Sequence, residues 1–331
     1  MVNSLFHNKI VFFNTTLTFF IVLLHSSPLN RLGITDISKY VFINFTVHIC
    51  QIGVPMFFFI SAILFYKEGC NLCIKTKLHR RFFSLVIPYL LWNTLFVAIY
   101  YTLTHLSLSS SIMNMKGVLN SPKEILVGII FSEYTPLWFV KNLILYSLIS
   151  PILLFIISKK KLFFIIFLIS ILIVLYFKFQ YESFGYWLPV YLLGSFIGYN
   201  NTKINHPQHS LFYIFLFIAI TITSYYTIIP LFFYRLLSPI ILWFLADLYI
   251  KNYLLIRFKE KQWMHYTFFI YCTHFFILNI LQKLIFIYIP ISSVFINLVF
   301  ITSPIITIYL LIQIAKWFSN YSLYKYFTGG R

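Results

Sequence analysis

The chain is poor in charged residues, and acidic residues are the scarcest of them. Only 7 of its 331 residues are Asp or Glu, and charged residues of both signs make up 10%. A soluble domain needs about a quarter of its residues charged, so this composition excludes ordinary soluble domains. The acids fall in loops or near the ends of apolar runs. Ion-driven transport needs carboxylates at mid-membrane and glycoside hydrolysis needs a pair of them, so both functions are disfavoured.

Several other chemical signatures are missing as well. The sequence has no glycine-rich phosphate loop, no nucleotide-binding motif and no internal repeat. Of its four cysteines, Cys70 and Cys73 have the C-x-x-C spacing of half a zinc site, but no second Cys or His pair completes it. We therefore predict reduced thiols and no bound metal.

Apolar residues dominate what is present. Hydrophobic residues make up 60% of the chain and the mean hydropathy is +0.88. A helix needs about 20 predominantly apolar residues to cross a bilayer. The sequence therefore predicts an all-α polytopic membrane protein, a single integral membrane domain over residues 1–331 with no separate soluble domain. About ten transmembrane helices are expected, at 10–27, 41–66, 83–104, 136–157, 162–179, 186–199, 210–228, 230–250, 266–289 and 293–315.

The 25 Lys and Arg give the chain a formal net charge of +18. In a soluble protein this excess would suggest nucleic acid, but in a membrane protein Lys and Arg gather in the cytoplasmic loops. With the N-terminus inside, seventeen of the cations fall in the inner connections and tails and five in the outer connections. We therefore predict that both termini are cytoplasmic, and that the chain contacts membrane lipids and not nucleic acid.

A polar face is predicted along the first span. Asn14, Thr18 and His25 share one side of a helix that turns about 100° per residue, and His25 lies about 16 Å from Asn14 along the axis. The topology places His25 towards the outer side and Asn14 towards the cytoplasm. Because imidazole titrates near neutrality, His25 is a candidate general base for a hydroxyl group. The alternative is an interfacial histidine that anchors the end of the helix.

Two further polar features lie in or beside the predicted spans. For the intramembrane histidines His48 and His274, a structural hydrogen bond is favoured over catalysis. Lys77, Arg80 and Arg81 come just before the third span. They either set the topology and attract anionic lipid, or they bind phosphate through paired donors.

Five segments, in a fixed order along the chain, carry a family resemblance. They are FNTTLTFFIVLLHSS (13–27), VPMFFFISAILFYK (54–67), KLHRRFFSLVIPYLLWN (77–93), LWFVKNLILYSLISPIL (137–153) and TFFIYCTHFFILN (267–279). Together they resemble the integral membrane acyltransferase family 3, which O-acetylates bacterial surface polysaccharides. Three positions depart from the family's pattern: Asn14 stands where many members have Arg, Ala62 where they have Gly, and Ser84 where they have the second Arg of R-x-x-R.

The resemblance implies a bacterial inner-membrane O-acyltransferase that takes acetyl groups from cytoplasmic acetyl-CoA and has no bound cofactor. The acceptor would be a hydroxyl of O-antigen or a related lipid-linked polysaccharide. His25 would be the general base, and Asn14 would belong to the catalytic site. Further candidates are Lys77, Arg80, Arg81 and Thr18 for the acyl donor, and Trp138, Phe139, His274 and Ser61 for the substrate or the tunnel.

Two other functions are open to a polytopic protein of this kind. A flippase or other transporter of lipid-linked sugars should show a chain of cations along its path, whereas only Lys141, Arg235 and Lys283 fall within the predicted spans, towards their outer ends. A glycan polymerase is expected to carry larger outer loops than this chain offers. The acyltransferase is therefore the favoured hypothesis.

Overall fold

The computed structural model describes residues 2–29, 32, 40–67, 74–105, 121–132, 136–200, 210–251, 260–288 and 292–330. Within these ranges every regular element is a helix. The chain divides into two compact units. Unit 1 comprises Met1–Ile21, Phe45–Lys77 and Leu148–Met264, and unit 2 comprises Val22–Asn44, Leu78–Ser147 and His265–Arg331.

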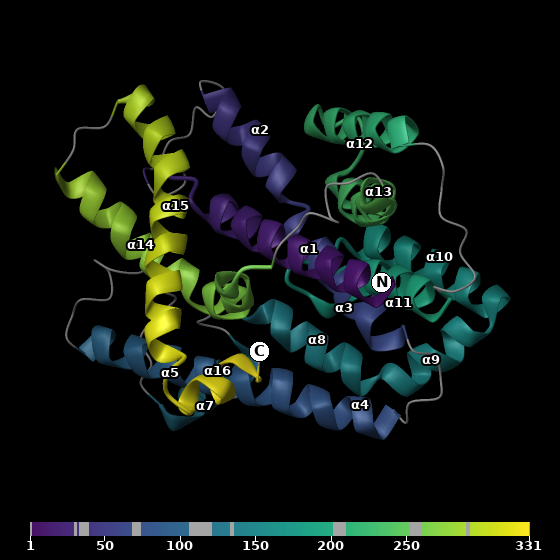
Figure 1. Cartoon of the computed structure of the whole chain (residues 1–331), viewed down its shortest axis with the longest axis horizontal. Coiled ribbons are helices and arrows are strands. Elements are labelled where there is room, and N and C mark those ends of the chain that lie inside the picture. Colours follow the sequence, from purple (N-terminus) through teal and green to yellow (C-terminus); the bar gives the residue numbers. More distant parts are fainter. Residues whose placement is uncertain are drawn as a thin grey trace. The chain divides into compact units, whose positions relative to one another are not determined.

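The helices of unit 1 come mainly from the middle of the chain. They are α3 (Gly53–Tyr66), α9 (Ser150–Ser158), α10 (Lys160–Phe177), α11 (Phe184–Tyr199), α12 (Ser210–Tyr225) and α13 (Leu231–Lys251), with most of α1 (Val2–His25) and of α2 (Val41–Cys50). Helices α12 and α13 follow each other in the chain and pack against each other, with α12 above α13 in the view of Figure 1.

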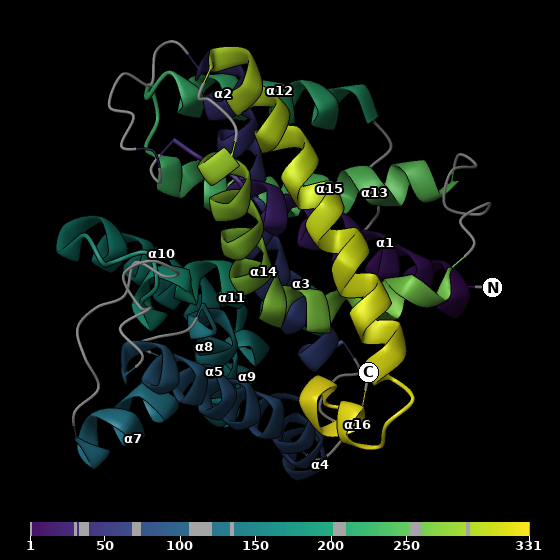
Figure 2. The ribbon, with the colours of Figure 1, turned by 90° about the vertical axis from the view of Figure 1, so that its left-hand side faces the viewer.

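Unit 2 contains the C-terminal helices and a long helix that begins in unit 1. Its helices are α5 (Ile87–His105), α7 (Pro122–Phe131), α8 (Trp138–Leu148), α14 (Thr267–Tyr288), α15 (Ser293–Phe318) and α16 (Leu323–Thr328). Helix α4 (Ile74–Arg81) continues into α5 through a π-helical turn, Phe82–Val86, and a 3₁₀ turn, Gln262–Tyr266, precedes α14. Helices α14 and α15 lie side by side (Figure 2).

Six helical stretches in the described ranges are long and apolar enough to cross a membrane: Phe6–His25, Val41–Tyr66, Ile74–Leu103, Lys160–Phe177, Gln262–Tyr288 and Ser293–Phe318. A seventh is added if α8 and α9, which are separated at Ile149, count as one broken span. The remaining expected spans correspond to α11, α12 and α13. The 16 residues of α11 reach only about 24 Å, less than a hydrocarbon core of about 30 Å. The all-helical, multi-pass architecture is confirmed, and the count of ten and the orientation of the termini stay predictions.

A close helix contact organises unit 1. Gly194 and Gly198, four residues apart on α11, face α3 without side chains between the two backbones. A Cβ atom on Gly194 would lie 2.5 Å from the carbonyl oxygen of Phe59, and one on Gly198 would lie 2.7 Å from that of Ile63. Small residues at this spacing allow helix backbones to approach closely inside a membrane, where apolar burial adds little to association.

In unit 2 the C-terminal helix folds back onto α5 (Figure 1). The indole Nε1 of Trp92 donates a hydrogen bond to the carbonyl oxygen of Phe327, at 2.9 Å. Gly329 follows with a φ of +66°, a region that residues with a Cβ atom rarely occupy. A Cβ on Gly329 would lie 2.6 Å from the backbone of Ser84, so the tail is seated directly on the π-helical turn.

The connection between residues 105 and 135 contains helix α7. Ser121 and Glu124 form a capping box at its start, with Pro122 at the first helical position. At its end the Tyr89 hydroxyl donates to the carbonyl oxygen of Ile130, at 2.6 Å. This hydrogen bond attaches α7 to α5.

Candidate functional site

Two histidines predicted from different segments meet in unit 2. His25 is the last residue of α1 and His274 lies in the first half of α14. Their ring centroids are 5.4 Å apart with the planes tilted by 42°. The ring of Phe275 stands edge-on to His25 at 5.5 Å. The structure therefore places a candidate base beside a second imidazole.

The hydrogen bonds of His274 define its tautomer. Its Nδ1 lies 2.7 Å from the carbonyl oxygen of Tyr271 and 3.2 Å from that of Ile270. Carbonyl oxygens only accept, so Nδ1 carries the proton and the neutral ring keeps its lone pair on Nε2. That Nε2 is buried and no described residue bonds to it. His274 thus makes the structural hydrogen bond expected of it, and in addition it offers a spare acceptor next to His25.

Hydrogen bonds directly behind His25 fix the end of α1. The Gln282 Nε2 donates to the carbonyl oxygen of Ser26, at 2.7 Å, and to the hydroxyl of Ser303, at 2.9 Å. The Ser26 hydroxyl donates in turn to the carbonyl oxygens of Leu23 and Phe300. Gln282, Ser26 and Ser303 are all fully buried, so α14 and α15 hold the residue that follows the candidate base.

An aromatic wall extends from the histidine pair. The ring of Tyr271 lies 6.2 Å from that of His274, and the ring of Phe139 stands edge-on to Tyr271 at 5.8 Å. The Tyr271 hydroxyl donates to the carbonyl oxygen of Pro136, at 3.0 Å, just before Trp138 begins α8. Of the predicted substrate or tunnel residues, the structure therefore brings Phe139 and His274 together through Tyr271.

The predicted polar face of α1 lies on an uninterrupted helix. The Thr18 hydroxyl donates to the carbonyl oxygen of Asn14, at 2.7 Å, and the Thr18 side chain is buried. Asn14 is half-buried, and its amide has no hydrogen bond from the described residues. Asn14 and Thr18 belong to unit 1 and His25 to unit 2.

The basic cluster is helical rather than part of a loop. Lys77, Arg80 and Arg81 lie on α4 at spacings of three and four residues, which puts them on one face. The Lys77 Nζ donates to the carbonyl oxygen of Phe65, at 2.6 Å, and so binds the last turn of α3. Arg80 is exposed and Arg81 half-buried. The tunnel candidate Ser61 is half-buried on α3 in unit 1, and Cys70 and Cys73 lie outside the described residues.

The residues that hold the site in place are not among those predicted from the sequence. Gln282 and Ser303 are polar side chains within long apolar helices. Polar groups inside a membrane cost free energy, so their positions in the sequence already indicate a structural or functional role. Tyr271 offered no such signal, because 25 tyrosines occur in the chain. Its importance follows from its contacts alone.

Unit 1 contains a separate polar network around Arg235. The guanidinium donates through Nη1 to the Tyr186 hydroxyl, at 2.8 Å, and through Nη2 to the Gln51 Oε1, at 2.7 Å. Its central carbon lies 4.3 Å from the ring centroid of Tyr181. Burial raises the pKa of Tyr181 to about 12, so this hydroxyl stays protonated at neutral pH. Neutral oxygens and an aromatic face therefore surround this cation.

Comparison with known proteins identifies the family of the chain. A family model described as an acyltransferase domain matches residues 15–314. The match includes both histidines, the aromatic wall, the buried glutamine and the basic cluster. No curated protein and no solved structure matched the chain. The family match covers far more than half of the sequence, and it agrees with the resemblance of the five segments: this chain belongs to the acyltransferase family 3.

Proposed function

We propose that the chain is an O-acetyltransferase of the bacterial inner membrane. It moves an acetyl group from cytoplasmic acetyl-CoA to a hydroxyl of a surface glycan, such as O-antigen or a related lipid-linked polysaccharide. Membership of the family supports acyl transfer within a membrane protein. The observation that carries the assignment of a hydroxyl acceptor is the pair formed by His25 and His274, with its unused buried Nε2.

The chemistry requires a base at the acceptor. A sugar hydroxyl attacks a thioester efficiently only as its proton is removed. In direct transfer, His25 takes that proton while the hydroxyl oxygen bonds to the acetyl carbon, and the bond from this carbon to sulfur breaks. The proton then passes from His25 to the departing thiolate. The protein returns to its starting state with one ester formed and one thiol released.

His274 has the role of a positioning residue in this scheme. Its Nδ1 proton is held by two carbonyl oxygens, so its Nε2 can only accept. That lone pair stabilises the imidazolium that forms on His25. In Ser-His-Asp enzymes a buried carboxylate orients and stabilises the catalytic histidine. Here acids are scarce, and a neutral imidazole takes that position.

The proposed binding site for the acyl donor is the basic face of α4. We assign the phosphates of acetyl-CoA to Arg80 and Arg81, because guanidinium groups bind phosphate through paired donors. Lys77 contributes less, since its Nζ already binds the end of α3. The thioester arm then extends along the α1 face of Asn14 and Thr18. Trp138, Phe139 and Ser61 are further proposed contacts of the substrate.

Acetylation by purified protein tests the proposal. The protein in detergent is given acetyl-CoA and base-deacylated surface polysaccharide from the source cell, and NMR follows the acetyl esters formed. His25→Ala is expected to lower kcat by about 10²- to 10⁴-fold. His7→Ala is the matched control, because His7 is exposed on the same helix and, among the described residues, makes one surface hydrogen bond, to Glu260. Full activity in His25→Ala would show that His25 is not the general base.

In the cell, the same variant distinguishes the acetyltransferase hypothesis from the flippase hypothesis. A strain with His25→Ala should export its polymer normally and lose the acetyl esters. Loss of export, with the residual polymer still acetylated, would favour a transporter.

A further inference from the structure

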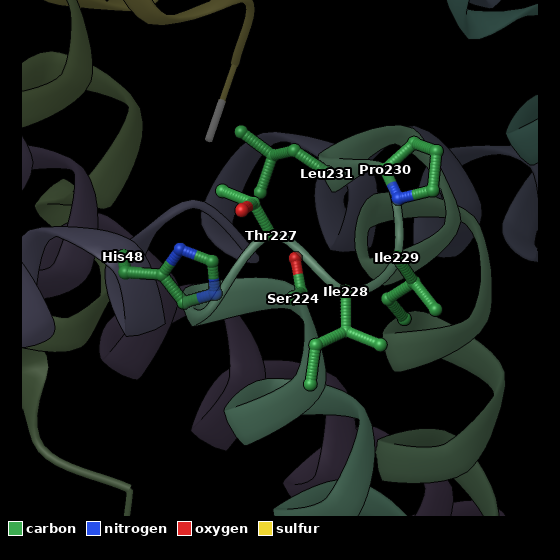
Figure 3. Close-up of a pocket in the computed structure, with 7 residues that line it drawn as sticks. All are labelled: His48, Ser224, Thr227, Ile228, Ile229, Pro230 and Leu231. Atoms are coloured by element: carbon green, nitrogen blue, oxygen red, sulfur yellow. The ribbon is translucent and has the colours of Figure 1, made fainter.

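An open pocket lies in unit 1, at the turn between α12 and α13. It has a volume of about 420 Å³ and is lined by His48, Ser224, Thr227 and residues 228–231. Figure 3 shows the His48 ring on one side and Ile228, Ile229 and Pro230 on the other, with Ser224 and Thr227 between them and Leu231 above Thr227. Cavities of this size hold small organic groups. None of the roles assigned above uses it.

Two polar atoms of this pocket are buried without a partner. The Nε2 of His48 and the hydroxyl oxygen of Ser224 are inaccessible, and no described residue hydrogen-bonds to either. A buried polar atom without a hydrogen bond costs free energy. Both residues line the same pocket, so one ligand with adjacent hydroxyls would satisfy both atoms once a small side-chain rotation turns them towards it.

The pocket is held in shape by its surroundings. The His48 ring stacks on Tyr234 at 5.0 Å and meets Tyr225 edge-on at 5.5 Å. The turn is closed by the N–H of Thr227, which donates to the carbonyl oxygen of Ser224, and by that of Ile228, which donates to the carbonyl oxygen of Thr223. The His48 ring and the backbone of the turn are thus held before any ligand arrives, which lowers the cost of binding.

The lining decides the class of ligand. Residues 228–231 supply an apolar wall, and the lining contains no Lys, Arg, Asp or Glu. An anionic lipid headgroup or a phosphate would need charged donors. A neutral sugar presents hydroxyls on its edge and C–H groups on its faces, which matches an imidazole and a hydroxyl opposite an apolar wall.

We propose that this pocket binds a sugar unit of the acceptor glycan. The proposal rests on the proposed function, and it adds the place where the acceptor is held. The predicted topology puts the turn between α12 and α13 on the outer side of the membrane, where the glycan arrives.

Steady-state kinetics at varied concentrations of the acceptor polysaccharide test whether the pocket binds it. The probe is the base-deacylated surface polysaccharide of the source cell, at saturating acetyl-CoA. Ser224→Ala and His48→Phe should each raise the KM for the polysaccharide about three- to tenfold, as expected for one lost hydrogen bond, with kcat little changed. Ser238→Ala is the matched control, since Ser238 is buried on α13 with an equally unpartnered hydroxyl but does not line the pocket. Its KM should equal that of the wild type.

A substitution at the pocket entrance guards against misfolding of the buried variants. Ile228 is 70% exposed, so Ile228→Trp should fold normally and raise the KM by blocking the pocket. An unchanged KM in Ser224→Ala, His48→Phe and Ile228→Trp alike would overturn the pocket assignment.

Direct binding separates this proposal from the proposed function. Saturation-transfer NMR with oligosaccharides cut from the same polysaccharide is carried out on His25→Ala protein, which should bind without turnover. If the wild type binds these oligosaccharides through Ser224 and His48 but never acetylates them, the proposed function fails and the pocket stands. If it acetylates them and no pocket variant changes KM or binding, the function stands and the pocket fails.

Discussion

At the scale of single residues, the candidate site depends on imidazoles with defined hydrogen bonds. His25 and His274 come from opposite ends of the sequence and lie ring to ring. The lone pair on the Nε2 of His274 follows from two carbonyl oxygens that can only accept. The roles of the two rings therefore differ, and substitutions should separate them.

His274→Phe tests its positioning role. The substitution keeps an aromatic ring against Tyr271 and His25 and removes both nitrogens. We expect kcat to fall, by less than in His25→Ala, with the KM for acetyl-CoA unchanged. Steady-state kinetics on the purified variant measure this split. A raised KM with normal kcat would show that His274 binds substrate and does not support the base.

Gln282→Leu tests the hydrogen bonds behind His25. The change leaves the carbonyl oxygen of Ser26 and the hydroxyl of Ser303 without their donor in a fully buried place. We expect a loss of about 1–3 kcal/mol of stability, seen as a lower Tm in detergent, together with a lower kcat. Gln313→Leu is the control, because Gln313 is exposed on α15. An unchanged Tm in Gln282→Leu would contradict the expected contribution of these bonds.

At the scale of elements, close backbone contacts join helices from distant parts of the chain. The α3 and α11 pair has two glycines where side chains would collide with carbonyl oxygens. The α16 tail reaches the π-helical turn through a glycine with positive φ. That turn directly follows Arg80 and Arg81 on the same continuous helix, so the seating of the tail and the position of the basic face depend on each other.

Gly194→Ala tests the α3 and α11 contact. The new methyl would lie 2.5 Å from the carbonyl oxygen of Phe59, which is backbone and cannot move without its helix. We expect destabilisation by about 1–3 kcal/mol, measured as a fall in Tm and in the yield of monodisperse protein. Gly185→Ala on the same helix is the control, because its methyl would meet only the side chain of Phe179. Equal Tm values for the two variants would show that α3 and α11 tolerate separation.

At the scale of the whole molecule, the predicted topology assigns opposite sides to two exposed tyrosines. Tyr226 is 68% exposed between α12 and α13, and Tyr321 is 51% exposed before α16. In a chain whose native cysteines are replaced by Ser, Tyr226→Cys should react with an impermeant maleimide in spheroplasts. Tyr321→Cys should react only after lysis. The reverse pattern would invert the topology and would place the sugar pocket on the cytoplasmic side.

Much of the architecture is readable from the sequence because a bilayer core contains no water, so backbone polar groups must hydrogen-bond within the chain. Long apolar runs had to become helices, and they did, for example at Lys160–Phe177 and Ser293–Phe318. The helix at Pro122–Phe131 lies outside the predicted spans, although its capping box is visible in the sequence. The break between α8 and α9 is followed by Pro151 in the first turn of α9. The apolar residues on both sides of the break do not by themselves indicate where α8 ends.

The sequence by itself determined the helical class, the polar face of α1 and the choice of His25, because helix periodicity and the cost of polar groups in lipid are local properties. Only the tertiary structure decided what stands beside each of these residues. It brought His274 to His25, Gln282 to Ser26, and His48 to Ser224, pairs separated by 249, 256 and 176 residues of chain. Such pairings depend on how helices pack, and packing is set by the fit of many side chains at once.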